Sequence, residues 1–375
     1  MESDVLSYFI RLVKIDSESR NERAIADALI QDLIELGAEV TEDRCCESTT
    51  GNAGNLIARI PGSVDKAPIL FCAHIDTVVP GVGVKPQIVD GKVVTDGTTV
   101  LGGDDKSGVA EIIMGIKALK DQGIDHAPLE ILFTVSEEVG LLGAKCFDKS
   151  GLKAAFGYAF DTQNIGDLVL GAPSQNSFEL IIKGKEAHAG VEPEKGINAI
   201  RVASEAIAAM PLGRIDFETT ANVGTISGGM ATNIVPNKVV IHGEARSHSQ
   251  AKLDQVCSDI RKAVETAVAK HHNDHSAASF ELEIEAEYKA FRLSEDAEPV
   301  ILAKQALTSI GIEPKTAVGG GGSDANIINA AGVPMIIVGT GMMRYHTVNE
   351  YITIKDLEDG TAFVSKLIQL YSEAK

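Results

Sequence analysis

The sequence has no hydrophobic run near the roughly 18 residues that a membrane-spanning helix needs. Its first residues, MESDVLSYFIRLVKIDSES, carry acidic side chains in an amphipathic pattern. A signal peptide would instead need a basic start and an uninterrupted apolar stretch. These two absences argue against a membrane protein and a secreted precursor, and we therefore expect a cytoplasmic protein.

Cysteine is scarce, with five residues in the whole chain, and no C-x-x-C motif occurs. Cys45 and Cys46 are adjacent, whereas Cys72, Cys146 and Cys257 are scattered. The odd count and the missing motif argue against a disulfide framework and against a cysteine zinc site. We therefore expect reduced thiols, most of them buried.

Basic residues are outnumbered, with 34 against 53 acidic residues and a net charge of −19. This excess of negative charge disfavours nucleic acids and anionic membranes as partners. The chain has 375 residues and is 44% hydrophobic, which is ample for a core. A chain of this length favours two domains over one compact unit.

Helical and strand-like patterns alternate at both ends of the chain. Apolar residues in the segment ending at Gly37 recur at intervals of three and four, which is typical of a helix. Strand-like runs such as APILFCAHI and LEILFTVS alternate with helical segments such as VAEIIMGIKALKDQG. Strands that alternate with helices predict a three-layer α/β domain.

The pattern changes between about residues 175 and 288. The order of segments there is β-α-β-β-α-β, and the first strand, SFELIIKG, alternates like a half-exposed antiparallel strand. This order predicts a ferredoxin-like α+β unit. Because the α/β pattern returns afterwards, we expect a discontinuous α/β domain at 1–174 and 289–375 with residues 175–288 inserted into it.

Two polar side chains end the apolar strand at residues 69–73. His74 and Asp76 are two positions apart, so on an extended chain they point to the same side. Ligand sites of open α/β sheets lie at the carboxyl ends of the strands. A carboxylate beside the second ring nitrogen is common for a metal-binding histidine. A surface histidine beside a turn-capping aspartate is the alternative.

Two pairs of adjacent acids occur at similar positions. Asp104 and Asp105 follow two glycines and precede an expected helix, where capping is the alternative role. Glu137 and Glu138 end the strand at 129–136, and adjacent carboxylates repel each other unless a cation lies near them. One of this second pair would bind a metal ion while its neighbour takes a proton from water, with helix capping again the alternative.

Asp161 and His346 each follow a further apolar strand. With His74, Asp104 and Glu138 they form a set of nitrogen and oxygen donors without a thiolate, which suits zinc, cobalt or manganese. Five ligands with one shared carboxylate fit two divalent metal ions about 3.5–4 Å apart. The sequence therefore predicts a two-metal site at the strand ends.

These motifs also carry a family resemblance. H-x-D-T, G-G-D-D-K-S-G, S-E-E-V-G, Asp161 and Y-H-T resemble the di-zinc exopeptidases that include peptidase T, carboxypeptidase G and the aminoacylases. The resemblance covers essentially the whole chain, and LGGDDKSGVAEI is most similar to the peptidase T branch. It implies a di-zinc exopeptidase catalytic domain with an inserted lid or dimerisation domain, a homodimer, and a cis peptide between Asp104 and Asp105.

The resemblance distributes the metal ligands between two zinc ions. His74, Asp104 and Asp161 would hold one ion. Asp104, Glu138 and His346 would hold the other, so that Asp104 bridges the pair.

Catalytic roles follow from the same resemblance. Glu137 would be the general base, and Asp76 would orient His74. His188, in KGKEAHAG, would stabilise the oxyanion, in some members of the family from the neighbouring subunit. A surface histidine is the alternative for His188.

Four further residues are candidates for substrate contacts. The resemblance places Asn233, in ATNIVPNKV, where the family contacts substrate. Arg246, in GEARSHS, would clamp a substrate carboxylate with two hydrogen bonds, with a surface cation as the alternative. Gly321 and Ser323 belong to a glycine loop before a helix, whose free amides would hold a carboxylate. Plain helix capping by Ser323 and Asp324 is the alternative. The arginine of the peptidase T motif R-G-G-T-D-G is missing here, so the resemblance does not carry strict tripeptide selectivity.

The predicted function is metal-dependent hydrolysis of the peptide bond of short peptides, with a two-metal-activated water and Glu137 as base. An N-acyl amino acid deacylase or a dipeptidase of the same family is the alternative enzyme. A metal-stabilised peptide-binding protein is the alternative from another class, but it would not need Glu137 beside Glu138.

Overall fold

The computed structural model describes residues 4–274 and 276–374 and divides into two compact units. The first unit comprises residues 4–171, 292–319 and 323–374, and the second comprises 172–291 with the short segment 320–322. The borders expected from the sequence, at 175 and 288, lie close to those of the second unit.

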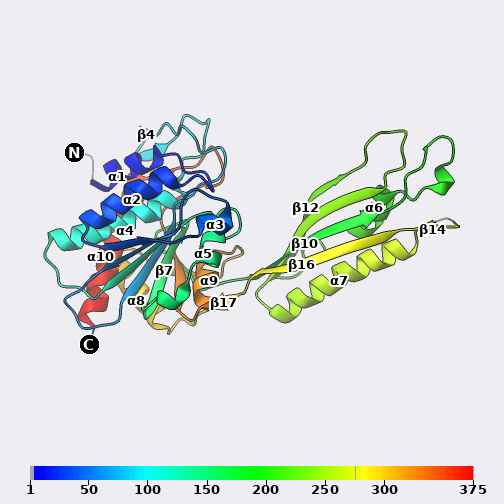
Figure 1. Cartoon of the computed structure of the whole chain (residues 1–375). Coiled ribbons are helices and arrows are strands. Elements are labelled where there is room, and N and C mark those ends of the chain that lie inside the picture. The colour runs from blue at the N-terminus through cyan, green and yellow to red at the C-terminus, as the bar shows by residue number, and fades with distance from the viewer. Residues whose placement is uncertain (1–3, 275, 375) are drawn as a thin grey trace. The chain divides into compact units, whose positions relative to one another are not determined.

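A mixed eight-stranded sheet forms the centre of the first unit (Figure 1). In spatial order its strands are β1 (Glu39–Glu42), β2 (Leu56–Ile60), β6 (Leu129–Thr134), β3 (Ile69–His74), β7 (Phe156–Thr162), β19 (Met335–Gly339), β8 (Asp167–Val169) and β18 (Lys315–Ala317). The four central strands, β6, β3, β7 and β19, are parallel. Their carboxyl ends therefore meet at one edge of the sheet.

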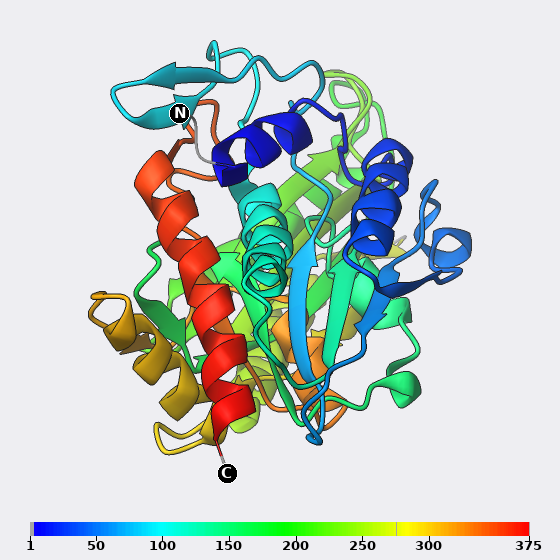
Figure 2. The same ribbon diagram turned by 90° about the vertical axis from the view of Figure 1, so that its left-hand side faces the viewer.

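Helices cover both faces of this sheet. Figure 2 shows α4 and α10 in front of the strands, with α1 and α2 beside them, while α5 and α9 lie on the opposite side in Figure 1. The helices of this unit are α1 (Asp4–Val13), α2 (Arg23–Glu35), α3 (Cys46–Thr49), α4 (Gly103–Asp121), α5 (Leu142–Cys146), η1 (Lys149–Gly151), α8 (Glu298–Ser309), α9 (Asp324–Ala330) and α10 (Ile354–Glu373). The arrangement has the three layers predicted from the sequence.

The core of this unit explains the near-continuous apolar runs of its central strands. Every residue of β3 and of β6 is buried, because helices cover both faces of the parallel strands. Phe71 of β3 lies 6.2 Å from Tyr158 and 6.1 Å from Phe160 between ring centroids. A small sheet of β20 (Ile352–Thr353), β5 (Lys92–Val94) and β4 (Gln87–Val89) contributes Val93 and Ile352 to this core.

Two cysteines depart from the expectation of reduced thiols. Cys45 and Cys146 form a disulfide, with their Cα atoms 5.7 Å apart. The bond joins Cys45, the residue before α3, to Cys146, the last residue of α5, although the two are 101 residues apart in the chain. The expectation was wrong for this pair because odd counts and short spacings do not report which thiols meet in space. Cys46, Cys72 and Cys257 are free.

The second unit is an antiparallel sheet with two helices on one face. Apart from several two-residue strands, its order is β-α-β-β-α-β, as predicted. Its elements are β10 (Ser174–Lys183), η2 (Pro193–Lys195), α6 (Ala199–Ala209), β11 (Gly213–Arg214), β12 (Thr219–Gly228), β13 (Lys238–Ser247), α7 (Gln250–Ala269), β14 (His272–Asn273), β15 (Ser276–Ala277) and β16 (Ser279–Tyr288). The sheet order is β11-β12-β13-β10-β16, and its core is separate from that of the first unit.

Two further findings complete the description. The strands β9 (Gly171–Ala172) and β17 (Phe291–Arg292) pair where the chain passes between the units. Among the described residues, no helix is both long enough and apolar enough to cross a membrane.

The burial of Phe71 generates a test of the core. Phe71 is fully buried, whereas Phe217 in the second unit is 83% exposed. Replacing a buried phenylalanine with alanine costs about 3–5 kcal/mol through lost burial and the cavity left behind. We expect Phe71→Ala to lower the free energy of unfolding by this amount in urea titrations followed by circular dichroism. Phe217→Ala should leave it nearly unchanged, and equal losses in the two variants would contradict this account of the core.

Candidate active site

The site lies where the central parallel strands end. His74 is the last residue of β3, Glu137 and Glu138 follow β6, and Asp161 lies near the end of β7. His346 belongs to the loop that follows β19. Because these strands are parallel and adjacent, their carboxyl ends bring residues from distant parts of the sequence to one edge. The structure thus brings the predicted ligand residues to a common region.

Three of these residues form a group with the geometry of a metal site. The ligand atoms of His74, Asp104 and Glu138 all lie within 4.8 Å of one another. One imidazole nitrogen and two carboxylate oxygens suit a divalent cation such as zinc, cobalt or manganese. The donor set present in the structure therefore fits a metal ion.

Asp104 occupies the central place in this group. Its Oδ1 lies 2.9 Å from Nε2 of His74, and its Oδ2 lies 3.2 Å from Nε2 of His346. The same Nε2 atom of His346 lies 2.9 Å from a carboxylate oxygen of Glu138. Each oxygen of Asp104 thus faces a different histidine, which is the orientation that a carboxylate shared by two ions needs.

The charges around Asp104 favour cations. Burial alone would raise the pKa of Asp104, but hydrogen bonds to His346 and His74 lower it to about 2. Conversely, hydrogen bonds to Asp104 and Glu138 raise the pKa of His346 to about 10. Burial opposes protonation of His74, yet its contacts with Asp104 and Asp76 raise its pKa above the ordinary value. The imidazoles here supply positive charge to a cluster of carboxylates. Bound metal ions would supply positive charge to the same carboxylates.

Three further acids in the site are disfavoured as anions. Burial raises the pKa of Glu137 well above its usual range, and the negative charge of Asp161 adds to this shift. Burial also raises the pKa of Glu138, against the effect of its hydrogen bond to His346. The pKa of Asp161 is raised by burial and then by the charge of Asp104. Carboxyl groups held this close need a cation between them to ionise together.

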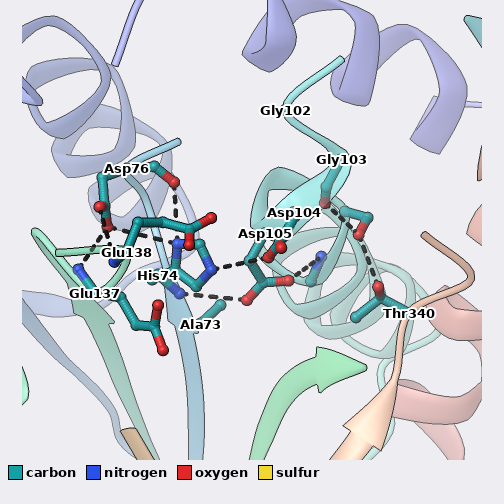
Figure 3. Close-up of polar contacts among 12 residues, drawn as sticks. Ala73, His74, Asp76, Gly102, Gly103, Asp104, Asp105, Glu137, Glu138 and Thr340 are labelled. Atoms are coloured by element: carbon teal, nitrogen blue, oxygen red, sulfur yellow. Dashed lines mark hydrogen bonds and ion pairs between the residues drawn. The ribbon is translucent and has the colours of Figure 1, made fainter. Parts of the chain in front are cut away.

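Asp76 contacts both the histidine and the loop of the paired glutamates (Figure 3). Its Oδ1 lies 3.5 Å from Nδ1 of His74, which also lies 3.0 Å from the backbone oxygen of Asp76. The backbone N–H of Glu137 donates to Oδ1 at 2.9 Å, and that of Glu138 donates to Oδ2 at 3.3 Å. Asp76 therefore positions both Glu137, the candidate base, and His74, the candidate ligand. The sequence did not reveal the contact with Glu137.

The loop that carries Asp104 has an unusual backbone. The helix α4 begins at Gly103, but Asp104 and Asp105 have non-helical dihedral angles within its first turn. The peptide between them is cis, as the family resemblance implied, and Val79–Pro80 is also cis. Asp105 Oδ2 accepts a hydrogen bond from the backbone N–H of His74 at 3.3 Å. This contact ties the loop of Asp104 to the end of β3.

The predicted residues of the second unit have different surroundings. His188 and Asn233 are exposed. The backbone N–H of Ala189 donates to the backbone oxygen of Asn233 at 2.9 Å. Arg246 is half-buried, and its guanidinium is already paired with Glu244. Nε donates to Oε1 at 2.9 Å and Nη2 to Oε2 at 3.0 Å, so two of its donors are engaged within the protein.

The glycine loop also differs from a simple substrate cradle. Gly321 is exposed, but Ser323 is buried and accepts a hydrogen bond from the N–H of Ala325 as the N-cap of α9. Ser323 also hydrogen-bonds to Asp161, and this contact lowers the pKa of that carboxyl against the effect of burial. The contacts of Ser323 are therefore those of the capping alternative, with an added role beside Asp161.

Sequence reasoning missed the residues that support the site from outside. Glu22, which precedes α2, is fully buried, and its Oε1 accepts hydrogen bonds from the N–H and the Oγ of Ser136 at 3.1 and 2.9 Å. Ser136 directly precedes Glu137. Ser19 Oγ donates to Asp76 Oδ2 at 2.7 Å. The only sequence signal was an S-x-S-x-x-E pattern beside a helix start, which reads as ordinary capping.

Comparisons with known proteins agree with this geometry. Residues 70–370 match the model of peptidase family M20/M25/M40. The chain belongs to this peptidase family. The sequence-based prediction of a peptidase T-like member, with a three-layer α/β domain and an inserted α+β unit, is confirmed.

Three relatives illustrate the similarity within this family. A crystal structure of the aminopeptidase PepT from Bacillus cereus is 41% identical, with a TM-score of 0.89 over 98% of each chain. A crystal structure of a tripeptidase from Staphylococcus aureus is 36% identical, with a TM-score of 0.94 over 100% of this chain and 99% of that chain. Peptidase T of Vibrio cholerae is 28% identical over 98% of each chain.

The contacts of Glu22 generate a test of its supporting role. Glu22→Ala would remove the acceptor of three hydrogen bonds, because Oε1 also accepts the N–H of Arg20 at 2.7 Å. Buried donors left unpaired cost about 1–3 kcal/mol, so we expect a loss of this size in the free energy of unfolding. Glu22→Gln should lose much less, because Oε2 has no hydrogen-bond partner and an amide keeps the Oε1 acceptor. Chemical unfolding of both variants is the measurement, and equal losses would show that Ser136 does not depend on this oxygen.

Proposed function

We propose that this protein is a two-metal exopeptidase that hydrolyses short peptides in the manner of peptidase T. The observation that carries the proposal is the position of Asp104, whose two carboxylate oxygens face two different histidines. The similarity to a PepT aminopeptidase and to a tripeptidase over nearly the whole chain supports the substrate class. Zinc is the proposed metal, with cobalt or manganese as alternatives that the same donors accept. The cytoplasmic location expected from the sequence is part of this proposal.

We assign the ligands as the family resemblance implies. His74, Asp104 and Asp161 would hold one ion, and Asp104, Glu138 and His346 the other. The short contacts of Asp104 and Glu138 with the histidines support this assignment, as does the effect of the Asp104 charge on the pKa of Asp161. When bound, the ions would lower the pKa of a water molecule and polarise the scissile carbonyl.

The chain's own residues supply the proton transfers. Glu137 would accept the proton of the attacking water and return it to the leaving amine, so that no net proton is consumed by the base. Burial raises the pKa of Glu137, and a carboxylate with a raised pKa is a stronger base. The hydrogen bond from its backbone N–H to Asp76 fixes the loop from which its side chain projects.

The second unit is proposed to act as a lid and dimerisation domain. His188 would stabilise the oxyanion, from its own or the neighbouring subunit, and Asn233 and Arg246 would contact the substrate. The half-buried guanidinium of Arg246 can donate two parallel hydrogen bonds to a carboxylate, which supports this contact. The substrate carboxylate would have to displace that of Glu244. Gly321 remains a candidate contact through its backbone, whereas Ser323 would act on substrate only through Asp161.

Glu137 provides the decisive test of the mechanism. We expect Glu137→Gln to lower turnover of a tripeptide by about 10²- to 10⁴-fold, because an amide cannot accept the proton. The metal content, measured by elemental analysis, should stay nearly intact. Glu138→Gln is the matched control, and it should lose metal together with activity because a proposed ligand is removed. Full turnover in Glu137→Gln would rule out its role as the base.

The substrate class is tested by a panel of compounds. The zinc- or cobalt-loaded protein is incubated with a tripeptide, a dipeptide and an N-acetyl amino acid, each with and without prior removal of metal by a chelator. Cleavage of the tripeptide first, and only with metal, is the expected result. Preferred cleavage of the dipeptide or the N-acetyl compound would favour the alternative enzymes of the family. Binding of peptide without cleavage of any compound would favour the peptide-binding alternative.

The homodimer is proposed to form through the outer edge of β12. Within the described residues, the short strand β11 pairs only with Thr220 and Ala221, which leaves the rest of that edge without a neighbouring strand. Exposed apolar side chains occur on β12 and near its end: Ile226 of β12 is 51% exposed, Met230 is 81% exposed, and Ile200 of α6, which lies near Gly229, is 41% exposed. Paired edges related by a two-fold axis would give the free edge of β12 a neighbouring strand.

The opposite edge of the sheet is less suited to pairing. The edge strand β16 places charges at alternate positions, namely Glu281, Glu283 and Glu285. Repeated charges on an edge strand disfavour pairing with a second chain. The sequence of β12, TTANVGTISG, has no charged residue. The contrast between the two edges favours β12 as the interface.

Ile226→Glu should therefore produce a monomer. Two glutamates facing each other across a two-fold axis would be buried without partners, which is strongly unfavourable. Sedimentation velocity is the measurement, and Ile88→Glu is the control, because Ile88 is 45% exposed in the first unit. An unchanged dimer in Ile226→Glu would place the interface elsewhere, and a monomeric parent protein would refute the proposed dimer.

A further inference from the structure

We propose that Glu350 is a positioning residue that fixes Asp104 relative to His346. The inference rests on the proposed two-metal site and deepens it. Glu350 is 2% exposed. Its Oε2 accepts the backbone N–H groups of Leu101 and Gly102 at 2.7 and 2.8 Å, and its Oε1 accepts the N–H of Asp104 itself at 2.9 Å. One carboxylate thus holds three amides of the segment that ends at the shared ligand.

Glu350 also belongs to the loop that carries His346, four residues further along. Backbone hydrogen bonds in both directions between Met343 and Tyr351, at 2.9 and 3.0 Å, close this loop at its base. The N–H of Glu350 donates to the oxygen of Thr347 at 3.1 Å, which tightens the turn after His346. Glu350 therefore stands at a fixed point of the His346 loop and reaches across to the Asp104 loop.

The glycine directly before Asp104 is explained by this contact. A Cβ atom on Gly103 would lie 2.9 Å from Oε1 of Glu350, which is too close for an unstrained contact. Gly102 has a φ of +74°, a left-handed conformation that glycine adopts without steric cost. Gly103 thus leaves room for the carboxylate of Glu350, and Gly102 permits the left-handed turn of the backbone just before it.

The hydrogen-bond pattern requires a carboxylate at position 350. Both oxygens accept backbone N–H groups, whereas an amide side chain can accept at only one end and donates at the other. Glu350→Gln would set an NH₂ group against at least one backbone N–H. The Asp104 loop would then shift relative to His346, while every proposed metal ligand and Glu137 remain in the protein.

We expect Glu350→Gln to change the binding of the metal ions, and to change the reaction only as a consequence. Outer residues that orient metal ligands change metal affinity or activity by about 10- to 100-fold when they are replaced. We expect Glu350→Gln to lower the affinity of the protein for the second of its two ions by a factor in this range. The visible absorption spectrum of the cobalt-loaded protein should also change in position or intensity, because it reports the coordination of the ion.

Glu130 offers a matched control in the same unit. It is likewise buried, its Oε2 accepts the backbone N–H groups of Lys153 and Ala154 at 2.9 and 3.0 Å, and its Oε1 accepts Nε of Arg59 at 3.1 Å. It lies near the start of β6, at the opposite end of that strand from Glu137. Glu130→Gln makes the same chemical change away from the metal site and should leave metal affinity and the cobalt spectrum unchanged.

The experiment is a calorimetric zinc titration and a cobalt spectrum of the parent protein and the variants, with circular dichroism to verify folding. Gly103→Ala is the second variant, and it should reproduce the loss because it displaces Glu350 without removing it; it decides the matter if Glu350→Gln does not fold. If the parent protein binds two ions, and the folded variants bind them with the same affinity and the same cobalt spectrum, the role of Glu350 is overturned while the proposed function stands. A parent protein that binds no ions would overturn the proposed function and this inference with it.

Discussion

The contact of one carboxylate with two imidazoles is the constraint around which the catalytic unit is arranged. Asp104 Oδ1 faces His74 and Oδ2 faces His346. A carboxylate buried in this way is costly unless positive charge surrounds it, so the strand ends that meet here must deliver cationic groups or metal ions. The parallel order of β3, β6, β7 and β19 makes that meeting possible, because residues from four parts of the chain end at one edge.

A segment without any proposed ligand supports these strand ends. Between Ile15 and Glu22 the chain accepts a hydrogen bond from Nζ of Lys106 at 2.7 Å, donates one to Asp76, and accepts two from Ser136. These contacts reach the loop of Asp104, the loop after β3 and the loop of Glu137. The segment at the start of the first unit therefore connects three of the loops that form the site.

The sequence revealed the parts of the site that follow strands with a strong apolar pattern. His74, Glu137 and Glu138 were recognisable because a polar group at the end of a buried strand is unusual, and family membership confirms the fold class that this pattern indicated. The individual roles remain predictions. Glu22, Glu350 and the Cys45–Cys146 bond escaped notice because their partners are defined only by tertiary packing. Short strands such as β8 and β18 have too few residues to show a period.

The pairing of Arg246 with Glu244 has a consequence for the proposed substrate contact of Arg246. Any carboxylate that reaches this guanidinium enters a competition with a side chain that is already in place. The exchange replaces one charged hydrogen-bonded pair with another, so its net free energy is far smaller than that of filling a vacant fork. If Arg246 contacts the substrate as proposed, an incoming carboxylate would therefore gain little from its charge, because it has to displace Glu244.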